Sequence, residues 1–219
     1  MRRRGSIGFM PAPDHNPAQT RTMEIVPVTA EVWPALEALF RAGGDPRWCW
    51  CQYWRLRSKD FGAAKVPELR ARLREQAERS EPPPGLVALD VTGSDARALG
   101  WVSLGPRTDY ERIVRSKVIP AIDDRPVWSV VCFAVSASAR GRGVAKALLE
   151  GAVAFARERG AVALEAYPVR IGAGEGIHPD AAFTGTLPMF ERAGFRVVAE
   201  RASDPSASRV RVVVRRELG

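Results

Sequence analysis

Residues 127–145 read VWSVVCFAVSASARGRGVA, and this stretch decides how the chain folds. Its first nine residues, Val127–Val135, are rich in β-branched and aromatic side chains, which predicts a strand. Five small or polar residues follow, and a helix over 142–159 then begins within alternating glycines and arginines. Ala161–Tyr167 has the pattern of another strand. The region 127–167 therefore predicts one β-α-β crossover with parallel strands.

The turn that opens this helix has the chemistry of an anion site. Free N–H groups at a helix N-terminus, together with the helix dipole, attract negative charge. Glycines without Cβ atoms allow a phosphate to approach the backbone, and arginines add charge-assisted donors. A strand-to-helix turn that merely needs glycine is the alternative. The sequence predicts a diphosphate site formed by Arg140, Gly141, Arg142, Gly143, Val144, Ala145 and Lys146.

Two other phosphate-binding folds fit less well. The P-loop pattern G-x-x-x-x-G-K-[ST] is absent. A dinucleotide fold needs G-x-G-x-x-G, and Lys146 stands where its third glycine belongs. Glu165 lies about 20 residues on, as the ribose-binding acid of that fold does. The residues after Glu165, however, read as a hairpin more than as further βα units.

The rest of the chain predicts a mixed α/β sheet with flanking helices. Thr29 is the expected N-cap of the first helix, and Gly43–Gly44 its stop. The expected elements are a strand 24–28, helices 30–41 and 67–80, a hairpin of strands 86–91 and 97–104, a polar connection 105–125, a loop 170–180, a helix 181–193, and a terminal hairpin of strands 194–201 and 209–216.

Composition is that of one soluble domain. The chain has 219 residues, of which 46% are hydrophobic, and no apolar run of membrane-spanning length. We expect a disordered basic leader over 1–22 and a single domain over 23–219. Three cysteines are too few for a disulfide framework, which indicates a reducing cytoplasm.

The formal charge of +8 favours anionic partners. Nucleic acid is an unlikely one, because no zinc-finger spacing, RNA-binding aromatic signature or helix-turn-helix is found. The sequence leaves a homodimer open.

Two motifs resemble those of a known family. Arg140-x-x-Gly143-x-Ala145, between a strand and a long helix, resembles the acyl-CoA signature of the GNAT N-acetyltransferase superfamily. The run Met189–Phe195, which ends in Gly194-Phe195, resembles that family's helix-to-strand ending. The resemblance implies a splayed central sheet with acetyl-CoA in the gap. It also implies that pantetheine pairs with the backbone of Phe133, Ala134 and Val135, and that the pyrophosphate lies on the 140–145 turn.

The resemblance further implies transfer of acetyl to a primary amine of a small molecule or peptide by direct attack. Family members often carry a tyrosine acid at the position of Phe190, and many carry an asparagine at the position of Phe183. Phenylalanine cannot donate a proton. A catalytically silent acyl-CoA-binding protein is therefore the alternative.

Candidate catalytic groups lie on the strand after the crossover helix. Period-2 alternation places Ala163, Glu165 and Tyr167 on one face. If the sheet splays here, Glu165 is a candidate base and Tyr167 an acid or orienting group; a surface carboxylate and a half-buried tyrosine are the alternative. Ser129 and Cys132 are weaker candidates, since Cys132 as a nucleophile would need a neighbouring base.

The segment 48–55, WCWCQYWR, contains three of the six tryptophans. We interpret Trp48, Trp50, Tyr53 and Trp54 as a wall of the substrate pocket; a satellite core beneath a long loop is the alternative. Cys49-x-Cys51 lacks the usual zinc spacing and a full set of ligands, so no metal is expected. His178, in the 170–180 loop, could contact substrate.

Overall fold

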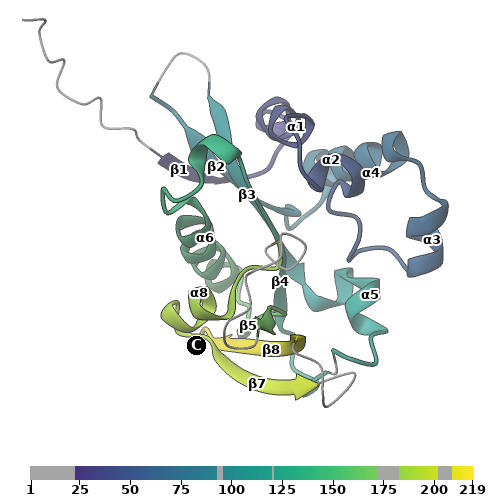
Figure 1. Cartoon of the computed structure of the whole chain (residues 1–219), viewed down its shortest axis with the longest axis vertical. Coiled ribbons are helices and arrows are strands. Elements are labelled where there is room, and N and C mark those ends of the chain that lie inside the picture. The colour runs from purple at the N-terminus through teal and green to yellow at the C-terminus, as the bar shows by residue number, and fades with distance from the viewer. Residues whose placement is uncertain (1–22, 93–95, 120, 172–182, 202–208) are drawn as a thin grey trace, which may run out of the picture.

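The computed structural model describes residues 23–92, 96–119, 121–171, 183–201 and 209–219. The predicted leader 1–22, His178 and most of the predicted 170–180 loop lie outside these residues. A long twisted sheet runs through the molecule and helices cover both of its faces (Figure 1). The expected mixed, splayed sheet with flanking helices is confirmed.

The sheet has eight strands among the described residues, in the order β1-β2-β3-β4-β5-β8-β6, with β7 paired to the other side of β8. All neighbours are antiparallel except β4 and β5, which are parallel as the crossover required. The strands are β1 Met23–Pro27, β2 Gly85–Asp90, β3 Arg97–Pro106, β4 Trp128–Val135, β5 Ala163–Ala166, β6 Val169–Ile171, β7 Arg196–Arg201 and β8 Arg209–Glu217.

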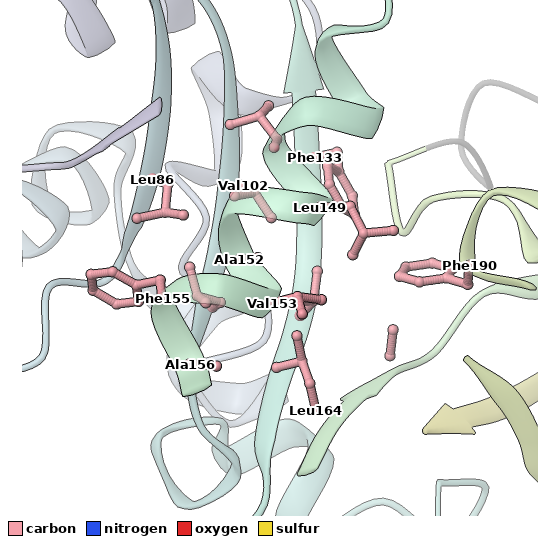
Figure 2. Packing of buried hydrophobic residues seen from close by; sticks show 14 of the residues in the cluster. Leu86, Val102, Phe133, Leu149, Ala152, Val153, Phe155, Ala156, Leu164 and Phe190 are labelled. Carbon is pink, nitrogen blue, oxygen red and sulfur yellow. The ribbon is translucent and has the colours of Figure 1, made fainter. Parts of the chain in front are cut away.

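Helices α6 (Val144–Glu158) and α8 (Leu187–Arg192) cover one face of the sheet. The predicted apolar stripe of α6 is confirmed, because its buried residues point into the sheet (Figure 2). Leu149 lies near Phe133 of β4 and Phe190 of α8, so the crossover helix, the central strand and the last helix share one core. Burial of these side chains fixes where the N-terminus of α6 stands relative to β4.

Five helices of the described residues cover the opposite face: α1 Trp33–Arg41, α2 Pro46–Cys49, α3 Ser58–Ala63, α4 Val66–Arg79 and α5 Glu111–Val114. A second core lies beneath them, and it includes Trp33 and Phe40 of α1 and the expected pair Leu69 and Leu73 of α4. Its largest fully buried side chain is Trp101 of β3. The sheet therefore has apolar packing on both faces.

Three sequence predictions about helix ends are wrong. The first helix begins at Trp33 rather than 30, and its N-cap is Val32 rather than Thr29, because Pro34 lacks an N–H and sits without cost in the first turn. The crossover helix begins at Val144, since Gly143 is its cap in the left-handed conformation (φ +78°). The helix expected over 181–193 is limited to Leu187–Arg192, with Pro188 in its first turn.

The polar connection 105–125 contains α5 and a 3-10 turn at Arg107–Asp109, and the predicted 170–180 loop begins within β6. Gly43 and Gly44 both adopt positive φ after α1, which confirms the predicted stop. Among the described residues, no helix combines the length and apolarity needed to cross a membrane.

Replacing Leu148 by Ala should lower the free energy of unfolding by about 2–5 kcal/mol, because a fully buried side chain of α6 leaves a cavity against β2 and β3. Urea unfolding at pH 7 measures this. The matched control is Glu150→Ala on the exposed face of the same helix, with an expected change within about 0.5 kcal/mol. Equal effects of the two variants would contradict the assigned face of α6.

Candidate functional site

The sheet separates where β4 and β5 diverge. Only three residue pairs join the two strands, and the last is Val130 with Ala166. Beyond this pair, β4 continues to Val135 with β3 on one edge and without β5 on the other. A register shift in the β3–β4 ladder leaves Val131 as an extra residue at this point. The backbone of β4 beyond residue 130 is therefore not paired by β5, which is what the predicted splay requires.

The glycine–arginine turn lies at the end of this unpaired strand. Gly141 and Gly143 have φ of +74° and +78°, and a Cβ at either position would meet open space. The first N–H groups of α6 have no acceptor within the helix, because the first such bond runs from Ala147 to the Gly143 carbonyl. Arg140 and Arg142 are exposed and form no ion pair with any described residue. The turn thus presents free N–H groups and two unpaired guanidinium groups to solvent.

The edge of β4 is partly occupied by another part of the chain. The Phe133 N–H donates to the Phe183 carbonyl at 2.6 Å. A ligand pairing with the backbone of Phe133 must replace this hydrogen bond. Val135 lies two residues farther along the same edge, and Ala134 between them faces β3, where it pairs with Trp101.

Phe190 is a residue of the hydrophobic core. Its ring is fully buried and contacts Phe133 and Phe195 at centroid distances of 6.2 and 5.2 Å. A Cβ on the neighbouring Gly185 (φ +80°) would lie 2.7 Å from this ring, so the turn before α8 is built tightly around it. The residue therefore anchors α8 beneath the unpaired part of β4.

Glu165 and Tyr167 lie together on the face opposite α6, as the alternation predicted. Both are buried, with 1% of each exposed, and the Tyr167 hydroxyl donates to Glu165 Oε2 at 3.1 Å. The same hydroxyl lies 2.7 Å from Ser129 Oγ of β4. These three residues form a continuous hydrogen-bonded chain from the last paired residues of β4 to the end of β5.

The charge of Glu165 is balanced by arginines from two other elements. Arg215 of β8 donates from Nε and Nη2 to Glu165 Oε1 at 3.1 and 2.8 Å, and it also pairs with Asp123. Arg107 Nε lies 3.6 Å from Glu165 Oε2. Because this carboxylate is fully buried and doubly paired, it does not meet solvent or a ligand directly.

Burial, and next the negative charge of Glu165, raise the pKa of Tyr167 well above its usual value. The phenol is therefore neutral at physiological pH and retains its proton. Among the groups of the chain, Tyr167 is the one that can both accept from Ser129 and donate to Glu165.

A family model described as "Acetyltransferase (GNAT) family" matches residues 35–173. The chain belongs to the GNAT acetyltransferase family. The match spans the whole of the splay, the glycine–arginine turn, Glu165 and Tyr167. A search of curated proteins gave no match.

Solved structures agree in fold. A GNAT-family protein from Desulfovibrio desulfuricans has a TM-score of 0.52 at 16% identity, over 90% of this chain and all of that one. A GCN5-related N-acetyltransferase from Kribbella flavida has 0.51 at 19% identity, over 90% of this chain and 98% of that one. The NatC complex bound to Gag peptide and CoA has 0.51 at 14%, over 90% of this chain and 99% of that one. At such identities the likeness establishes the fold.

The predicted aromatic wall of this GNAT protein is divided in two. Trp48 and Trp50 lie toward α1 and α4, and Trp50 is buried against Trp33 with ring centroids 6.0 Å apart. Tyr53 and Trp54 lie toward α3, α5 and β8. The four side chains do not form one exposed surface, because Trp50 and Trp54 are buried in the second core whereas Trp48 and Tyr53 are exposed.

Trp48 borders a cavity of about 490 Å³ together with three arginines: it is lined by Arg41, Arg47, Trp48, Trp50, Val66, Pro67 and Arg70. Glu37 is the acidic partner of Arg41 and Arg70. The pKa of Glu37 is lowered to about 2, and the hydrogen bonds from Arg70 are the largest cause. Trp48 itself is 57% exposed, with the guanidinium of Arg47 4.5 Å from its ring centroid.

Cys51 and Cys132 meet in the second core, with their sulfur atoms 3.7 Å apart and the Trp101 N–H donating to Cys51. A hydrogen bond to Cys132 and burial raise the pKa of the Cys51 thiol well above its usual value, despite a lowering contribution from Cys49. No group of three or more metal-ligating residues occurs in the described part of the chain. These cysteines pack as small apolar side chains.

Sequence reasoning did not identify the arginines around Glu165. Arg107 and Arg215 lie 58 positions before and 50 positions after it, in a 3-10 turn and a strand, with no local motif. Only the alternation within β8 contained a signal, since Arg211, Val213 and Arg215 share one face of that strand. The pairing of β5 with β8 brings Arg215 to the Glu165 carboxylate.

Replacing Arg215 by Met should lower the free energy of unfolding by about 3–5 kcal/mol, because Glu165 loses its closest cation while remaining buried. Urea unfolding measures the loss. The control Arg125→Met breaks an exposed ion pair with Glu217 and should change the free energy of unfolding much less, because solvent screens this pair. Adding Glu165→Gln to the Arg215 variant should recover part of the loss; no recovery would contradict the pairing.

Glu37 should contribute to acid unfolding. Its pKa is lowered in the folded protein from 4.5 to about 2, so its stabilisation is present above pH 4.5 and is lost as pH falls toward 2. We expect Glu37→Gln to be less stable than wild type by about 2–3 kcal/mol at pH 7, and this gap to close toward pH 2. Urea unfolding across this range tests it, with the exposed Glu75→Gln as control. A gap that is independent of pH would contradict the prediction.

Proposed function

We propose that this GNAT protein is an acetyl-CoA-dependent N-acetyltransferase that acetylates a primary amine of a small molecule or peptide. The observation that carries this proposal is the position of the glycine–arginine turn at the end of the unpaired part of β4. A ligand with a diphosphate at one end and a reactive group at the other would extend from α6 along β4 toward Ser129 and Tyr167. Its binding would have to open the packing over these two side chains, of which 0% and 1% are exposed. The solved NatC complex is described as bound to a peptide and CoA, which agrees with this class of ligands.

The residues of the turn fit a diphosphate. Open space at Gly141 and Gly143 lets phosphate oxygens approach the backbone, and Val144, Ala145 and Lys146 would donate their free N–H groups. Arg140 and Arg142 add two cations without competing carboxylates among the described residues. Pantetheine would pair with β4 at Phe133 and Val135, replacing the Phe183 carbonyl at the first of them.

In the reaction, the amine nitrogen attacks the thioester carbonyl carbon and the C–S bond breaks. The proton lost by the amine ends on the leaving sulfur, so the products are an amide and a free thiol. We assign proton transfer to the chain Ser129, Tyr167 and Glu165: Tyr167 accepts a proton through Ser129 and passes its own to Glu165. The return of that proton along the same chain neutralises the thiolate.

Direct attack is favoured over an acyl-cysteine intermediate. A nucleophilic thiol needs a base in contact with it. Among the described residues, the Cys132 sulfur contacts the Cys51 sulfur and the carbonyl of Phe133, at 3.7 and 3.9 Å. Neither accepts a proton readily, so Cys132 stays a packing residue.

A catalytically silent acyl-CoA-binding protein is the second candidate. It is favoured by the occupied N–H of Phe133 and by Phe190, which fills the core where family members often carry a tyrosine acid. Calorimetric titration with acetyl-CoA, combined with a free-thiol release assay over a panel of amines, separates the two. Binding without thiol release from any amine would support the silent protein.

The double change Arg140→Met and Arg142→Met should weaken acetyl-CoA binding about 10- to 100-fold, because it removes two charge-assisted contacts to the phosphates. The dissociation constant is measured by calorimetry at low salt. A double change of the same charge on exposed α4, Arg72→Met with Arg74→Met, should leave it unchanged. Unaltered affinity in the first variant would refute the assigned turn.

Tyr167→Phe should lower kcat about 100-fold or more while the dissociation constant of acetyl-CoA stays the same, because one proton-transfer group is lost. Ser129→Ala should act in the same direction. The control is Tyr110→Phe, which removes a buried hydroxyl that has no partner among the described residues. Rates near wild type in both Tyr167→Phe and Ser129→Ala would exclude the assigned chain.

A further inference from the structure

Arg211 of β8 differs from Arg215 and Arg107 near the splay because it has no carboxylate partner among the residues that the structure describes. The side chain is half-buried, and its Nη1 donates to the Tyr167 carbonyl oxygen at 2.6 Å. Its guanidinium lies 5.6 Å from the ring centroid of Trp54. Among the described residues it makes no ion pair, whereas Arg215, four residues along the same face, pairs with both Glu165 and Asp123.

An unpaired cation in this position costs free energy. Removing a guanidinium from water is compensated only when an anion or several acceptors replace the lost hydration. A single carbonyl uses one of the five donors that the guanidinium carries. Burial lowers the pKa of Arg211, because the charged guanidinium loses hydration. The indole N–H of Trp54 is also buried without an acceptor, so both side chains of this contact have unused donors.

The position of Arg211 places these donors beside the reaction site. The Tyr167 carbonyl follows directly on Ala166, the last residue of β5 that pairs with β4. Trp54 and Tyr167 belong to the core on the face opposite α6, so Arg211 lies across the sheet from the N-terminus of α6. The side chain is therefore not part of the diphosphate turn.

Other arginines of the region pair with carboxylates or are held by several acceptors. Arg112 donates to the Tyr53 carbonyl and to Ser58, and its guanidinium covers the Tyr53 ring at 4.0 Å. Arg55 pairs with Asp109 and Arg107 with Glu165, although the Nε of each is buried without a hydrogen-bond partner. Arg211 differs from Arg55 and Arg107 because no carboxylate among the described residues pairs with it.

We propose that Arg211 binds an oxyanion group, a carboxylate in the first instance, carried by the acceptor amine, so that the acceptor is an amino acid or a close analogue. A planar guanidinium held against Trp54 matches the two oxygens of a carboxylate. This inference rests on the proposed function and extends it by naming the second group of the acceptor. The hydrogen bond from Arg211 to the Tyr167 carbonyl would place that group beside the proposed proton-transfer chain.

The test is a thiol-release assay with acetyl-CoA and paired amines. The panel contains glycine, β-alanine, γ-aminobutyrate and the proteinogenic L-amino acids, each beside its carboxamide, with aminomethylphosphonate as the phosphorus oxyanion. Wild type should prefer the best acid over its carboxamide at least 10-fold in kcat/KM. Arg211→Met should raise KM for the acid about 10- to 100-fold and leave the carboxamide unchanged, which corresponds to the loss of a hydrogen-bonded charge.

Two controls keep structural effects apart from recognition. Arg211→Lys keeps the charge without the planar fork and should fall between wild type and Arg211→Met. Arg72→Met removes an exposed cation from α4 and should change neither substrate. The KM for acetyl-CoA should stay constant in all variants, because Arg211 lies outside the turn.

A second readout is independent of turnover: the same acids are titrated calorimetrically into protein saturated with CoA. Loss of acid binding in Arg211→Met supports this inference. If, in addition, no amine releases thiol with the wild type, the proposed function is contradicted while this inference stands. Turnover of amines without preference for the acids supports the proposed function and overturns this inference. Equal losses for acid and carboxamide, or no binding of any acid, also overturn it.

Discussion

The short pairing between β4 and β5 is the constraint on which the rest of the structure depends. The two strands are joined at Trp128, Ser129 and Val130 and then part. A longer ladder would pair the edge of β4 as far as Val135 and leave no unpaired backbone near the turn before α6. A shorter ladder would not hold β5 against β4. Strands β8, β6 and β7 would then be separated from the sheet, because they join it through β5.

The parting of these strands is stabilised differently on the two sides of the sheet. On the α6 side, the rings of Phe133, Phe190 and Phe195 fill the space beneath the unpaired strand. On the other side, the charged group centred on Glu165 ties β5 to β8 and to the turn after β3. The ion pairs of Glu165 hold the carboxylate to which the Tyr167 hydroxyl donates. In the function that we propose, the first side would contact the ligand and the second would transfer the proton.

Much of the site could be predicted from local patterns. The turn at residues 140–146 was recognisable because glycine, arginine and a following amphipathic helix are each local signals with a physical reason. Alternation placed Glu165 and Tyr167 on one face because a strand has a period of two. Local patterns did not show which of the aromatic residues 48–54 are buried: Trp50 and Trp54 belong to the second core, whereas Trp48 and Tyr53 are exposed.

The sequence by itself determined the fold class, the parallel crossover, the apolar stripe of α6 and the glycine–arginine turn before that helix, because all of these follow from periodicity and from residues adjacent in the chain. Only the tertiary structure decided which charges are satisfied. Arg215 meets Glu165 across 50 positions of sequence, and Arg211, on the same face of the same strand, meets only a carbonyl and an indole ring. Strand register brings such groups together, and register depends on the packing of the whole sheet rather than on neighbours along the chain.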